Sequence, residues 1–596
     1  MNEHLVIGLA AIIFFGVAAQ YVAWRLKLPS ILLLLISGFV LGPVSGLLNP
    51  DEQFGEFLFP AISFAVAIIL FEGGLSLKLR ELKTTSGVVR KLISVGLVAT
   101  FLLSFLLSKF TLGIPWVLAL LMGAILTVTG PTVVLPLLML IRPKGQIGSI
   151  LKWEGILNDP IGALFAVLVF EAIVSASLGK ATTLILSGFA ITILAGGVLG
   201  LAAGMLVATS LRHHWLPEFL NNAFTLAMVI TLYTLSNLIQ PESGLFSVTI
   251  MGIYLGNQRL ASIRDIIGFK EDLRVLLLSS LFIVLAARLQ FSDLQHIHFG
   301  SVLFLLLLVF LVRPLAVWLS SLGSNLSWQE KLFLAAMAPR GIVAAAIISL
   351  FAVKLETMGV DQSNVLAPNM FFIIVGTILI YGLAARPLAK TLNLSDDNPQ
   401  GCVILGSNLL SMALAKALKA EGMVTTIIDA RWANIKEARM EGINTLHANV
   451  LSEVVQEKIN LTGMGRFLAL TPNLELNSLA CIRFADIFGL KEVYQLGEPE
   501  DKDKPAQWIP DDLSGLALFG PNATYNELIR RIHHGAKVKR TPLTKDYSYD
   551  DYKSQNEDKN PILLALISEN KSLTFVTVNK KIQPRPGQVI ISLIDN

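Results

Sequence analysis

Apolar stretches as long as a membrane span follow one another along the first two thirds of the chain. A helix of about 20 apolar residues crosses the hydrocarbon layer of a bilayer, and many stretches of this chain approach that length. The thirteen candidates have approximate limits 4–24, 29–47, 58–77, 88–109, 114–140, 147–174, 181–210, 220–239, 242–257, 270–289, 299–321, 328–352 and 367–390. The pattern predicts a polytopic α-helical membrane domain over residues 1–392, embedded in a lipid bilayer.

The loops between these stretches differ in charge. Loops after even-numbered stretches carry few basic residues and several acids, such as Asp51 and Glu52. Loops after odd-numbered stretches, with the adjoining span ends, carry Arg25, Lys27, Lys78, Arg80, Lys83, Arg90, Lys91, Arg142, Lys144, Arg212, Arg259, Arg264, Lys270, Arg274 and Lys331. Because Lys and Arg accumulate on cytoplasmic loops, we expect an external N-terminus and a cytoplasmic C-terminal region.

Two of the stretches are interrupted in mid-span. The fifth contains Gly130-Pro131 and the twelfth contains Pro339-Arg340-Gly341. Proline removes a helical hydrogen-bond donor, and non-helical backbone is tolerated at membrane depth only inside protein or beside a cavity. Paired interruptions at corresponding places of two halves point to a transporter site. The spacing predicts two inverted repeats, stretches 1–6 and 8–13, in which helices 5 and 12 are broken.

The sixth stretch carries two carboxylates, Glu154 and Asp159, within an apolar run. A charge at mid-membrane costs about 3 kcal/mol or more and usually serves a function. A helix turns about 100° per residue, so these two side chains point about 140° apart. We therefore assign ion handling to Asp159 and a structural role to Glu154, with Arg340 as its counter-ion. The alternative is that both acids are packed structural groups.

Neutral oxygen donors are expected around Asp159. Asn158 offers an amide oxygen, Thr129 offers a hydroxyl and a freed carbonyl, and Ser243 at the start of the ninth stretch offers a further hydroxyl. Oxygen ligands suit hard cations. One carboxylate that binds either a cation or a proton exchanges one for the other without moving net charge.

Composition agrees with a membrane domain followed by a different region. Of all residues, 54% are hydrophobic and only 15% are charged, which is far from the average of a soluble domain. A polar linker covers 393–400, and the remainder resembles a soluble α/β protein. Both cysteines, Cys402 and Cys481, lie there without metal-type spacing, which argues against a disulfide framework and a zinc site.

Strand and helix patterns alternate after the linker. Strands are predicted near 401–406, 424–429, 444–449, 466–471 and 492–496, with helices near 408–421, 432–441, 451–460 and 474–489. This βαβ pattern is typical of a parallel sheet and predicts a Rossmann-like domain over 401–535. A charged segment at 536–560 has the composition of a mobile linker. Short apolar runs at 561–596 predict a small β-rich subdomain.

Three motifs of the membrane region resemble those of the cation/proton antiporter superfamily. They are TVTGPTVV at 127–134, EGILNDP at 154–160 and APRGIV at 338–343. The Asn158-Asp159 pair is similar to the NhaP/NHE branch, which is usually electroneutral. The resemblance implies exchange of Na⁺ or K⁺ for H⁺ by a homodimer, in which a core domain moves against a dimerisation domain.

The same resemblance implies roles for individual residues. It makes Asp159 the carboxylate that binds ion and proton, with Asn158 and Thr129 near the ion. It makes Glu154 and Arg340 an ion pair within the core. One departure concerns the fifth stretch, because many family members have Asp at the position that Gly130 occupies in this chain.

The C-terminal region resembles the RCK (TrkA-N) domain of K⁺ channels and antiporters, including TPNLELN at 471–477. A dinucleotide fingerprint reads G-x-G-x-x-G, but Asn408 and Ser411 replace two of these glycines. The resemblance implies a dimer and an adenine nucleotide held by Gly406, Ser407, Asn408, Asp429, Arg431, Asn449 and Thr471. The lost glycines favour AMP over NAD(H). The alternative is a nucleotide-free sheet that only assembles the dimer.

These features predict a nucleotide-regulated Na⁺(K⁺)/H⁺ antiporter of the bacterial inner membrane. We expect a transporter and not an enzyme, with no cofactor for transport and no nucleic-acid partner. An RCK-gated K⁺ channel or efflux system is the alternative, although the sequence has no Thr-Val-Gly-Tyr-Gly filter. A membrane oxidoreductase is disfavoured because the apolar stretches contain no Cys and no paired His.

Overall fold

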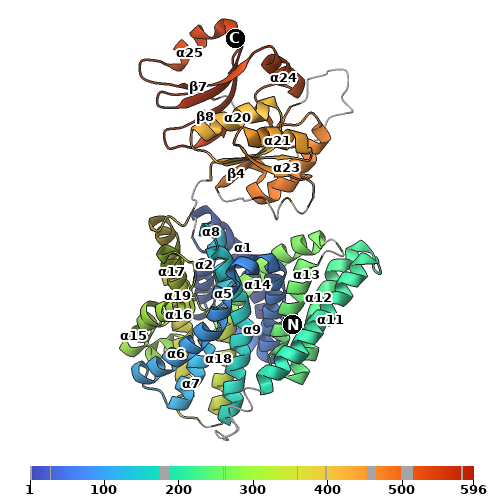
Figure 1. Ribbon diagram of the computed structural model, residues 1–596. Coiled ribbons are helices and arrows are strands. Elements are labelled where there is room, and N and C mark those ends of the chain that lie inside the picture. The colour runs from blue at the N-terminus through green and yellow to red at the C-terminus, as the bar shows by residue number, and fades with distance from the viewer. Residues whose placement is uncertain are drawn as a thin grey trace. The chain divides into compact units, whose positions relative to one another are not determined.

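The chain folds into two compact units, Met1–Ser395 and Asp396–Asn596. The computed structural model describes residues 3–595 apart from 27, 142, 175–186, 259–260, 262, 359, 396–398, 453–454, 456–458, 460–462, 498–513, 522 and 579–581. The first unit is a bundle of helices, whereas the second combines helices with two β-sheets (Figure 1). We refer to them as the membrane unit and the C-terminal unit.

The membrane unit consists of long apolar helices joined by short connections. Its α-helices are α1 (Glu3–Leu26), α2 (Ser30–Phe39), α3 (Pro50–Phe54), α4 (Leu58–Ser76), α5 (Leu79–Lys91), α6 (Leu97–Thr111), α7 (Trp116–Ile125), α8 (Pro131–Ile141), α9 (Ile147–Val174), α11 (Gly197–Arg212), α12 (Asn221–Ile239), α13 (Ser243–Asn257), α14 (Arg264–Ala287), α15 (Phe299–Leu307), α16 (Arg313–Ser320), α17 (Trp328–Ala335), α18 (Ile342–Thr357) and α19 (Leu366–Thr391). The π-helical turns η3 (Leu92–Gly96) and η7 (Leu308–Val312) join α5 to α6 and α15 to α16.

Helix length and composition identify a multi-pass membrane protein. Within the described residues, eight helical segments are long and apolar enough to cross a membrane, and 30–44 and 116–125 are shorter apolar helices. Part of the seventh expected stretch, 181–210, falls on residues outside the described ones. The total of thirteen spans therefore stays a prediction.

The two interrupted helices are confirmed. The fifth stretch divides into α7 and α8 with residues 126–130 between them, and the twelfth divides into α17 and α18 with residues 336–341 between them. The two unwound segments cross at Gly130 and Gly341, because a Cβ atom added to Gly130 would lie 2.5 Å from the Gly341 Cα atom. Only glycine at both positions allows this approach, whereas the inverted-repeat relation stays a prediction.

Helix α9 passes through the interior beside this crossing. It is the most buried of the eight candidate spans, and it packs against α7, α8 and α18. A Cβ atom on Gly162 of α9 would lie 3.0 Å from the backbone nitrogen of Val128 in the first unwound segment. The sixth stretch therefore presents one face directly to the break in the fifth.

The C-terminal unit contains the predicted parallel sheet. Six parallel strands lie in the order β3-β2-β1-β4-β5-β6. The strands are β1 (Gly401–Leu405), β2 (Thr425–Asp429), β3 (Asn444–His447), β4 (Met464–Ala469), β5 (Val493–Leu496) and β6 (Leu516–Leu518), and the described helices are α20 (Leu409–Ala420), α21 (Trp432–Met440) and α23 (Leu474–Phe488). The predicted helix at 451–460 falls largely outside the described residues.

A second sheet completes the unit and corrects the expected mobile linker at 536–560. It has the antiparallel order β7-β10-β8-β9, with β7 (Lys537–Pro542), β8 (Ile562–Ile567), β9 (Leu573–Phe575) and β10 (Val589–Ile594). Helices α24 (Tyr525–His533) and α25 (Tyr549–Gln555) accompany it. The β-rich subdomain predicted at 561–596 is therefore joined by β7, which lies within the segment expected to be a linker.

The charged composition of 536–560 has a different cause from the one expected. Strand β7 is the edge of its sheet, and most of its side chains are exposed, as is common for lysine-rich edge strands. Helix α25 contributes Tyr552, which is 1% exposed and donates a hydrogen bond of 2.7 Å to the Ser592 hydroxyl of β10. The segment is polar because one side of it faces solvent.

Substitution of Tyr552 tests this placement. Removing a large buried side chain costs about 3–5 kcal/mol, so Tyr552→Ala is expected to lower the unfolding free energy of the C-terminal unit by that amount and to open 536–560 to trypsin. Tyr552→Phe loses only the bond to Ser592 and costs about 1 kcal/mol. The exposed control Lys545→Ala changes neither readout; equal proteolysis of the parent protein and Tyr552→Ala contradicts a folded segment.

Candidate functional site

The predicted carboxylate lies at the centre of the membrane unit. Asp159 is fully buried on α9, and its neighbour Asn158 is 4% exposed. Neither carboxylate oxygen of Asp159 has a hydrogen-bond partner among the described residues, and the same holds for the Asn158 Oδ1 atom. A buried polar atom without a partner costs about 1–3 kcal/mol, so these oxygens are placed at a cost in stability.

The break in the fifth stretch adds two hydroxyl groups. Thr129 lies in the unwound segment and Thr132 in the first turn of α8, and both side chains are 6% exposed. Their Oγ1 atoms also lack a partner among the described residues. Five orphan oxygens on four buried side chains thus belong to α9 and to the adjacent break.

A small cavity reaches part of this group. Its lining includes Thr129 and Asn158 together with Glu154, Arg313 and Arg340. The structure therefore brings two of the predicted ion-site residues, Thr129 and Asn158, to one cavity, whereas Asp159, the next residue of α9, is not among its lining residues. Polar groups of both interrupted helices and of α9 meet at this cavity.

Glu154 has a different partner from the predicted one. Both of its carboxylate oxygens accept hydrogen bonds from the Arg313 guanidinium, from Nη1 and, at 2.9 Å, from Nη2. Glu154 and Arg313 are 3% and 4% exposed. The predicted pair of Glu154 with Arg340 is wrong, because Arg313 at the start of α16 occupies the bidentate position.

Arg340 binds backbone carbonyls. Its Nη1 atom donates to the carbonyl oxygens of Leu126 and, at 3.3 Å, of Val128, and its backbone N–H donates to the Thr377 hydroxyl at 3.2 Å. These carbonyls follow the end of α7, whose last carbonyls have no helical partner. A cation at a helix C-terminus also offsets the negative end of the helix dipole.

Arg313 serves the other interrupted helix in the same way. It donates from Nε to the Leu334 carbonyl at 3.1 Å and from Nη2 to the Met337 carbonyl at 3.0 Å, at the end of α17. Each half-helix that ends at a break is therefore capped by an arginine. The sequence offered a signal for Arg313, since a charge within the apolar eleventh stretch needs a partner.

Ser243 lies at the first turn of α13 in a cluster of serines. Its hydroxyl donates to the Ser236 carbonyl at 2.7 Å and lies 2.8 Å from the Ser236 hydroxyl, which is 2.6 Å from that of Ser247. Local hydrogen bonds thus occupy the Ser243 hydroxyl. Its predicted role as an ion ligand stays a prediction.

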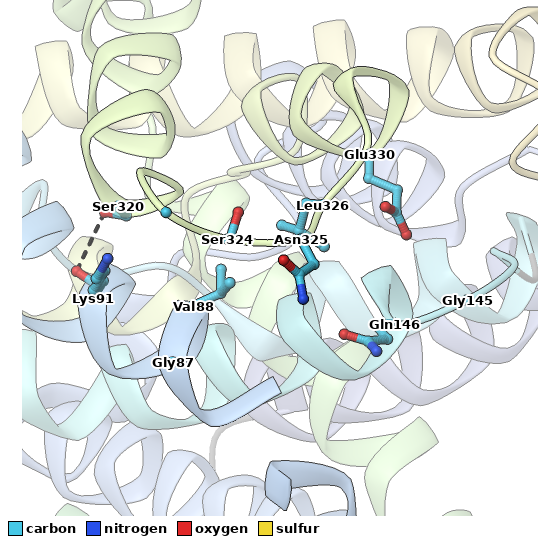
Figure 2. A pocket seen from close by; sticks show the side chains of 11 residues that line it. Gly87, Val88, Lys91, Gly145, Gln146, Ser320, Ser324, Asn325, Leu326 and Glu330 are labelled. Carbon is cyan, nitrogen blue, oxygen red and sulfur yellow. Dashed lines mark hydrogen bonds between the residues drawn. The ribbon is translucent and has the colours of Figure 1, made fainter. Parts of the chain in front are cut away.

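A larger polar pocket of about 500 Å³ opens elsewhere in the membrane unit. Figure 2 shows its walls, which come from α5, from the two residues before α9, and from the end of α16, the start of α17 and the connection between them. Lys91 and Ser320 face each other across one end, where the Ser320 hydroxyl donates to the Lys91 carbonyl at 3.2 Å. Asp159 and Asn158 are not among its lining residues.

The predicted nucleotide positions gather at the carboxyl edge of the parallel sheet. In doubly wound sheets, ligands bind at this edge where the strand order reverses, which here is between β1 and β4. Gly406 follows β1 and has a φ of +95°, which favours glycine. The predicted nucleotide residues all lie at or just after the last residue of a strand. After β1 these are Gly406, Ser407 and Asn408; at and after the end of β2, Asp429 and Arg431; after β3, Asn449; and after β4, Thr471.

Several donors of this edge are already engaged. The Asp429 carboxylate accepts from the backbone N–H groups of Ser407 at 2.8 Å and Arg431 at 2.7 Å. The backbone N–H of Asn408 donates to the Ser411 hydroxyl at 2.8 Å. Two backbone amides of the turn after β1, those of Ser407 and Asn408, are therefore engaged within the protein.

Tyr525 is a neighbour of this edge that the sequence did not reveal. Tyr525 is the first residue of α24, the helix that precedes β7. Burial together with the nearby Asp429 carboxylate raises the pKa of its hydroxyl. An aromatic ring close to the acid at the end of β2 offers a surface on which a base can stack. Its distance of almost 100 residues from Asp429 along the chain concealed this contact.

Replacement of Arg313 tests the observed ion pair. Breaking a buried pair costs about 3–5 kcal/mol, so Arg313→Met is expected to lower the unfolding free energy of the detergent-solubilised protein by that amount. The control Arg288→Met, which breaks a pair with the half-exposed Asp51, costs about 1 kcal/mol or less. A double-mutant cycle that couples Glu154 more strongly to Arg340 than to Arg313 contradicts the pairing.

The family models match both units of the chain. The model described as sodium/hydrogen exchanger, transmembrane, matches residues 10–391, and the TrkA-N domain matches residues 402–504. The first match covers more than half of the chain. The resemblance noted for the membrane motifs and that noted for the C-terminal region are therefore both confirmed.

Known proteins agree with these matches. The chain is 28% identical to Na⁺/H⁺ antiporter 1 of Methanocaldococcus jannaschii over 57% of this chain and 81% of that protein. It is 26% identical to the K⁺/H⁺ antiporter NhaP of Alkalimonas amylolytica over 72% of this chain and 74% of that protein. The structure of the sodium proton antiporter MjNhaP1 from M. jannaschii superposes with a TM-score of 0.55 and 25% identity, covering 65% of this chain and 99% of that one. This chain belongs to the sodium/hydrogen exchanger family and carries a TrkA-N domain behind its membrane unit.

Proposed function

We propose that the membrane unit exchanges Na⁺ or K⁺ for H⁺ by alternating access at Asp159. The observation that carries this proposal is the group of four buried oxygens on Asp159, Asn158 and Thr129 that lack partners among the described residues. A desolvated cation needs several oxygen ligands, and a proton needs only one of the carboxylate oxygens. The group therefore suits a site that binds either species in turn.

The formal charges of the site support electroneutral exchange. Glu154 and Arg313 neutralise each other, and the positive charge of Arg340 offsets that of ionised Asp159. Binding of one monovalent cation or of one proton at Asp159 then raises the net charge by the same amount. The cation-loaded and the protonated states carry equal charge. The membrane potential therefore affects the conformational change of both states alike, and a full transport cycle moves no net charge across the membrane.

The breaks supply what the moving site needs. Unwound backbone between α7 and α8 frees carbonyl groups near the ion, while Arg340 and Arg313 hold the carbonyls that end α7 and α17. The arginines keep the segments in place when the cation leaves. Because Asp159 is fully buried, it needs a conformational change to meet each side of the membrane.

We also propose that an adenine mononucleotide such as AMP, in preference to NAD(H), binds the C-terminal unit and regulates exchange in a homodimer of the bacterial inner membrane. The carboxyl edge with Asp429, Arg431 and Tyr525 supports the nucleotide. The nucleotide supplies no chemistry to transport and acts only through the conformation of the unit.

Backbone contacts give regulation a route to α9. The Lys144 backbone N–H, three residues before α9 begins, donates to the Leu394 carbonyl at 2.7 Å, after α19. In the C-terminal unit, the Leu573 backbone N–H of β9 donates to the Gln400 side chain at 2.6 Å. The connection between the units is thus fastened within each of them, and a force on it acts at the N-terminal end of the helix that bears Asp159.

Asp159→Asn tests the transport proposal. The amide cannot bind a proton and carries no charge for a cation, so exchange in proteoliposomes is expected to fall to the background rate while the protein stays folded. The assay follows the internal pH on addition of NaCl or KCl, with choline chloride as the blank. The control Asp361→Asn, at an exposed position, keeps full activity; retained exchange in Asp159→Asn contradicts the proposal.

Asp429→Ala tests the regulatory site. Titration calorimetry of the full chain is expected to show binding of AMP, weaker binding of NADH, and at least tenfold weaker binding of AMP after Asp429→Ala, because the sugar hydroxyls lose their acceptor. Exchange without nucleotide stays unchanged in this variant. The control Asp550→Ala, in the exposed first turn of α25, binds AMP as the parent does; equal affinity of parent and Asp429→Ala rejects the site.

A further inference from the structure

We propose that Thr132 is a further ligand of the transported cation and helps to determine which cation is accepted. This inference rests on the exchange site at Asp159 proposed above. It deepens that site by adding a residue to which the sequence motifs assigned no role. The argument uses the burial of Thr132, the state of its hydroxyl and the geometry of the helix crossing.

The Thr132 hydroxyl is a buried polar group without a partner. Its side chain is 6% exposed, and the Oγ1 atom forms no hydrogen bond among the described residues. Threonine in the first turn of a helix usually bonds to nearby backbone, so an idle hydroxyl here is unusual. A satisfied structural role would leave a bond in the structure, whereas a ligand role needs the oxygen to be available.

Thr127 provides an internal comparison at the same break. It is equally buried, at 2% exposed, but its hydroxyl donates to the Ala124 carbonyl at 2.7 Å and so helps to end α7. The break therefore contains one threonine that serves the backbone, and two, Thr129 and Thr132, whose hydroxyls remain unused. The bond to the Ala124 carbonyl explains the burial of the Thr127 hydroxyl. The Thr129 and Thr132 hydroxyls have no such bond and remain available to a ligand.

The position of the hydroxyl follows from the glycine crossing. Thr132 Oγ1 would lie 3.3 Å from a Cβ atom built on Gly130 and 3.6 Å from one built on Gly341. The hydroxyl thus borders the space that both glycines leave open where the two unwound segments cross. A side chain at residue 130 would collide with the Gly341 backbone in this structure, and the nearest side-chain atom to that position is the Thr132 hydroxyl oxygen.

Helix α9 brings Asp159 to the same region. Gly162, three residues after Asp159 and therefore on the same face of α9, packs on Thr127 and Val128 of the unwound segment. Asn158 on α9 and Thr129 in the break thus face one cavity, while Thr132 in the first turn of α8 borders the crossing of the two breaks, two residues after Gly130.

A hydroxyl suits both loaded states of an exchanger. Its two lone pairs can face a cation, and its O–H can turn to donate to the ionised carboxylate or to accept from the protonated one. Adding Thr132 raises the side-chain oxygens available from four to five. The strength and size of the site then depend on this oxygen, which makes it a determinant of the choice between Na⁺ and K⁺.

Thr132→Val is the test, because valine has nearly the same shape and lacks the oxygen. We expect the KM for the transported cation to rise about tenfold, the factor that a loss of about 1.4 kcal/mol gives, with kcat nearly unchanged and the KM ratio of Na⁺ to K⁺ altered. Thr132→Ser restores the oxygen and the parent KM. The matched control Thr249→Val, on α13, removes a buried hydroxyl that donates to the Leu245 carbonyl, so it lowers thermal stability and leaves the KM unchanged.

A binding measurement keeps the test independent of turnover. NaCl and KCl, each against choline chloride, are expected to raise the melting temperature of the purified full chain, and Thr132→Val should need about tenfold more cation for the same shift. An unchanged KM and an unchanged thermal titration in Thr132→Val overturn the inference. An equal rise of the KM in Thr132→Ser also overturns the inference, because it would show that the shape of the threonine side chain matters and not its oxygen. Exchange that persists in Asp159→Asn refutes the proposed function itself, whatever Thr132 does.

Discussion

Two helices that stop inside the membrane impose the main constraint on this protein. Each break exposes backbone carbonyls where lipid offers no hydrogen bonds, and the two breaks can cross only where Gly130 and Gly341 remove all side-chain bulk. Arg340 and Arg313 satisfy the carbonyls that end α7 and α17. The crossing therefore places two positively charged arginine side chains in the core. Their buried charges need acidic groups nearby.

The two arginines have different partners. Arg313 has a permanent partner in Glu154, held by two hydrogen bonds to both carboxylate oxygens. Arg340 makes its described side-chain bonds to backbone carbonyls of the first break. Glu154 is thus engaged in an ion pair, whereas the carboxylate oxygens of Asp159, on the same helix, have no hydrogen-bond partner among the described residues.

Periodicity and motifs predicted most of the architecture but not the contacts between distant segments. Long apolar runs and mid-span prolines located the membrane unit and both breaks, because each is a local property of the chain. The partner of Glu154 was wrong because sequence order does not show which arginine faces an acid, and Arg313 lies closer in space than Arg340. The strand β7 was missed because an exposed edge strand and a disordered linker have the same charged composition.

The remaining feature that local sequence could not reveal is the space at residue 130. The sequence shows only that Gly130 stands where many family members have Asp. The crossing gives a reason, since the Gly341 backbone occupies the volume that a side chain at residue 130 needs. In this structure the two backbones pack too closely at the crossing to leave room for a side chain at residue 130. The neighbouring Thr129 and Thr132 hydroxyls are buried without a hydrogen-bond partner among the described residues, which is why we propose them as oxygen ligands in place of an acid.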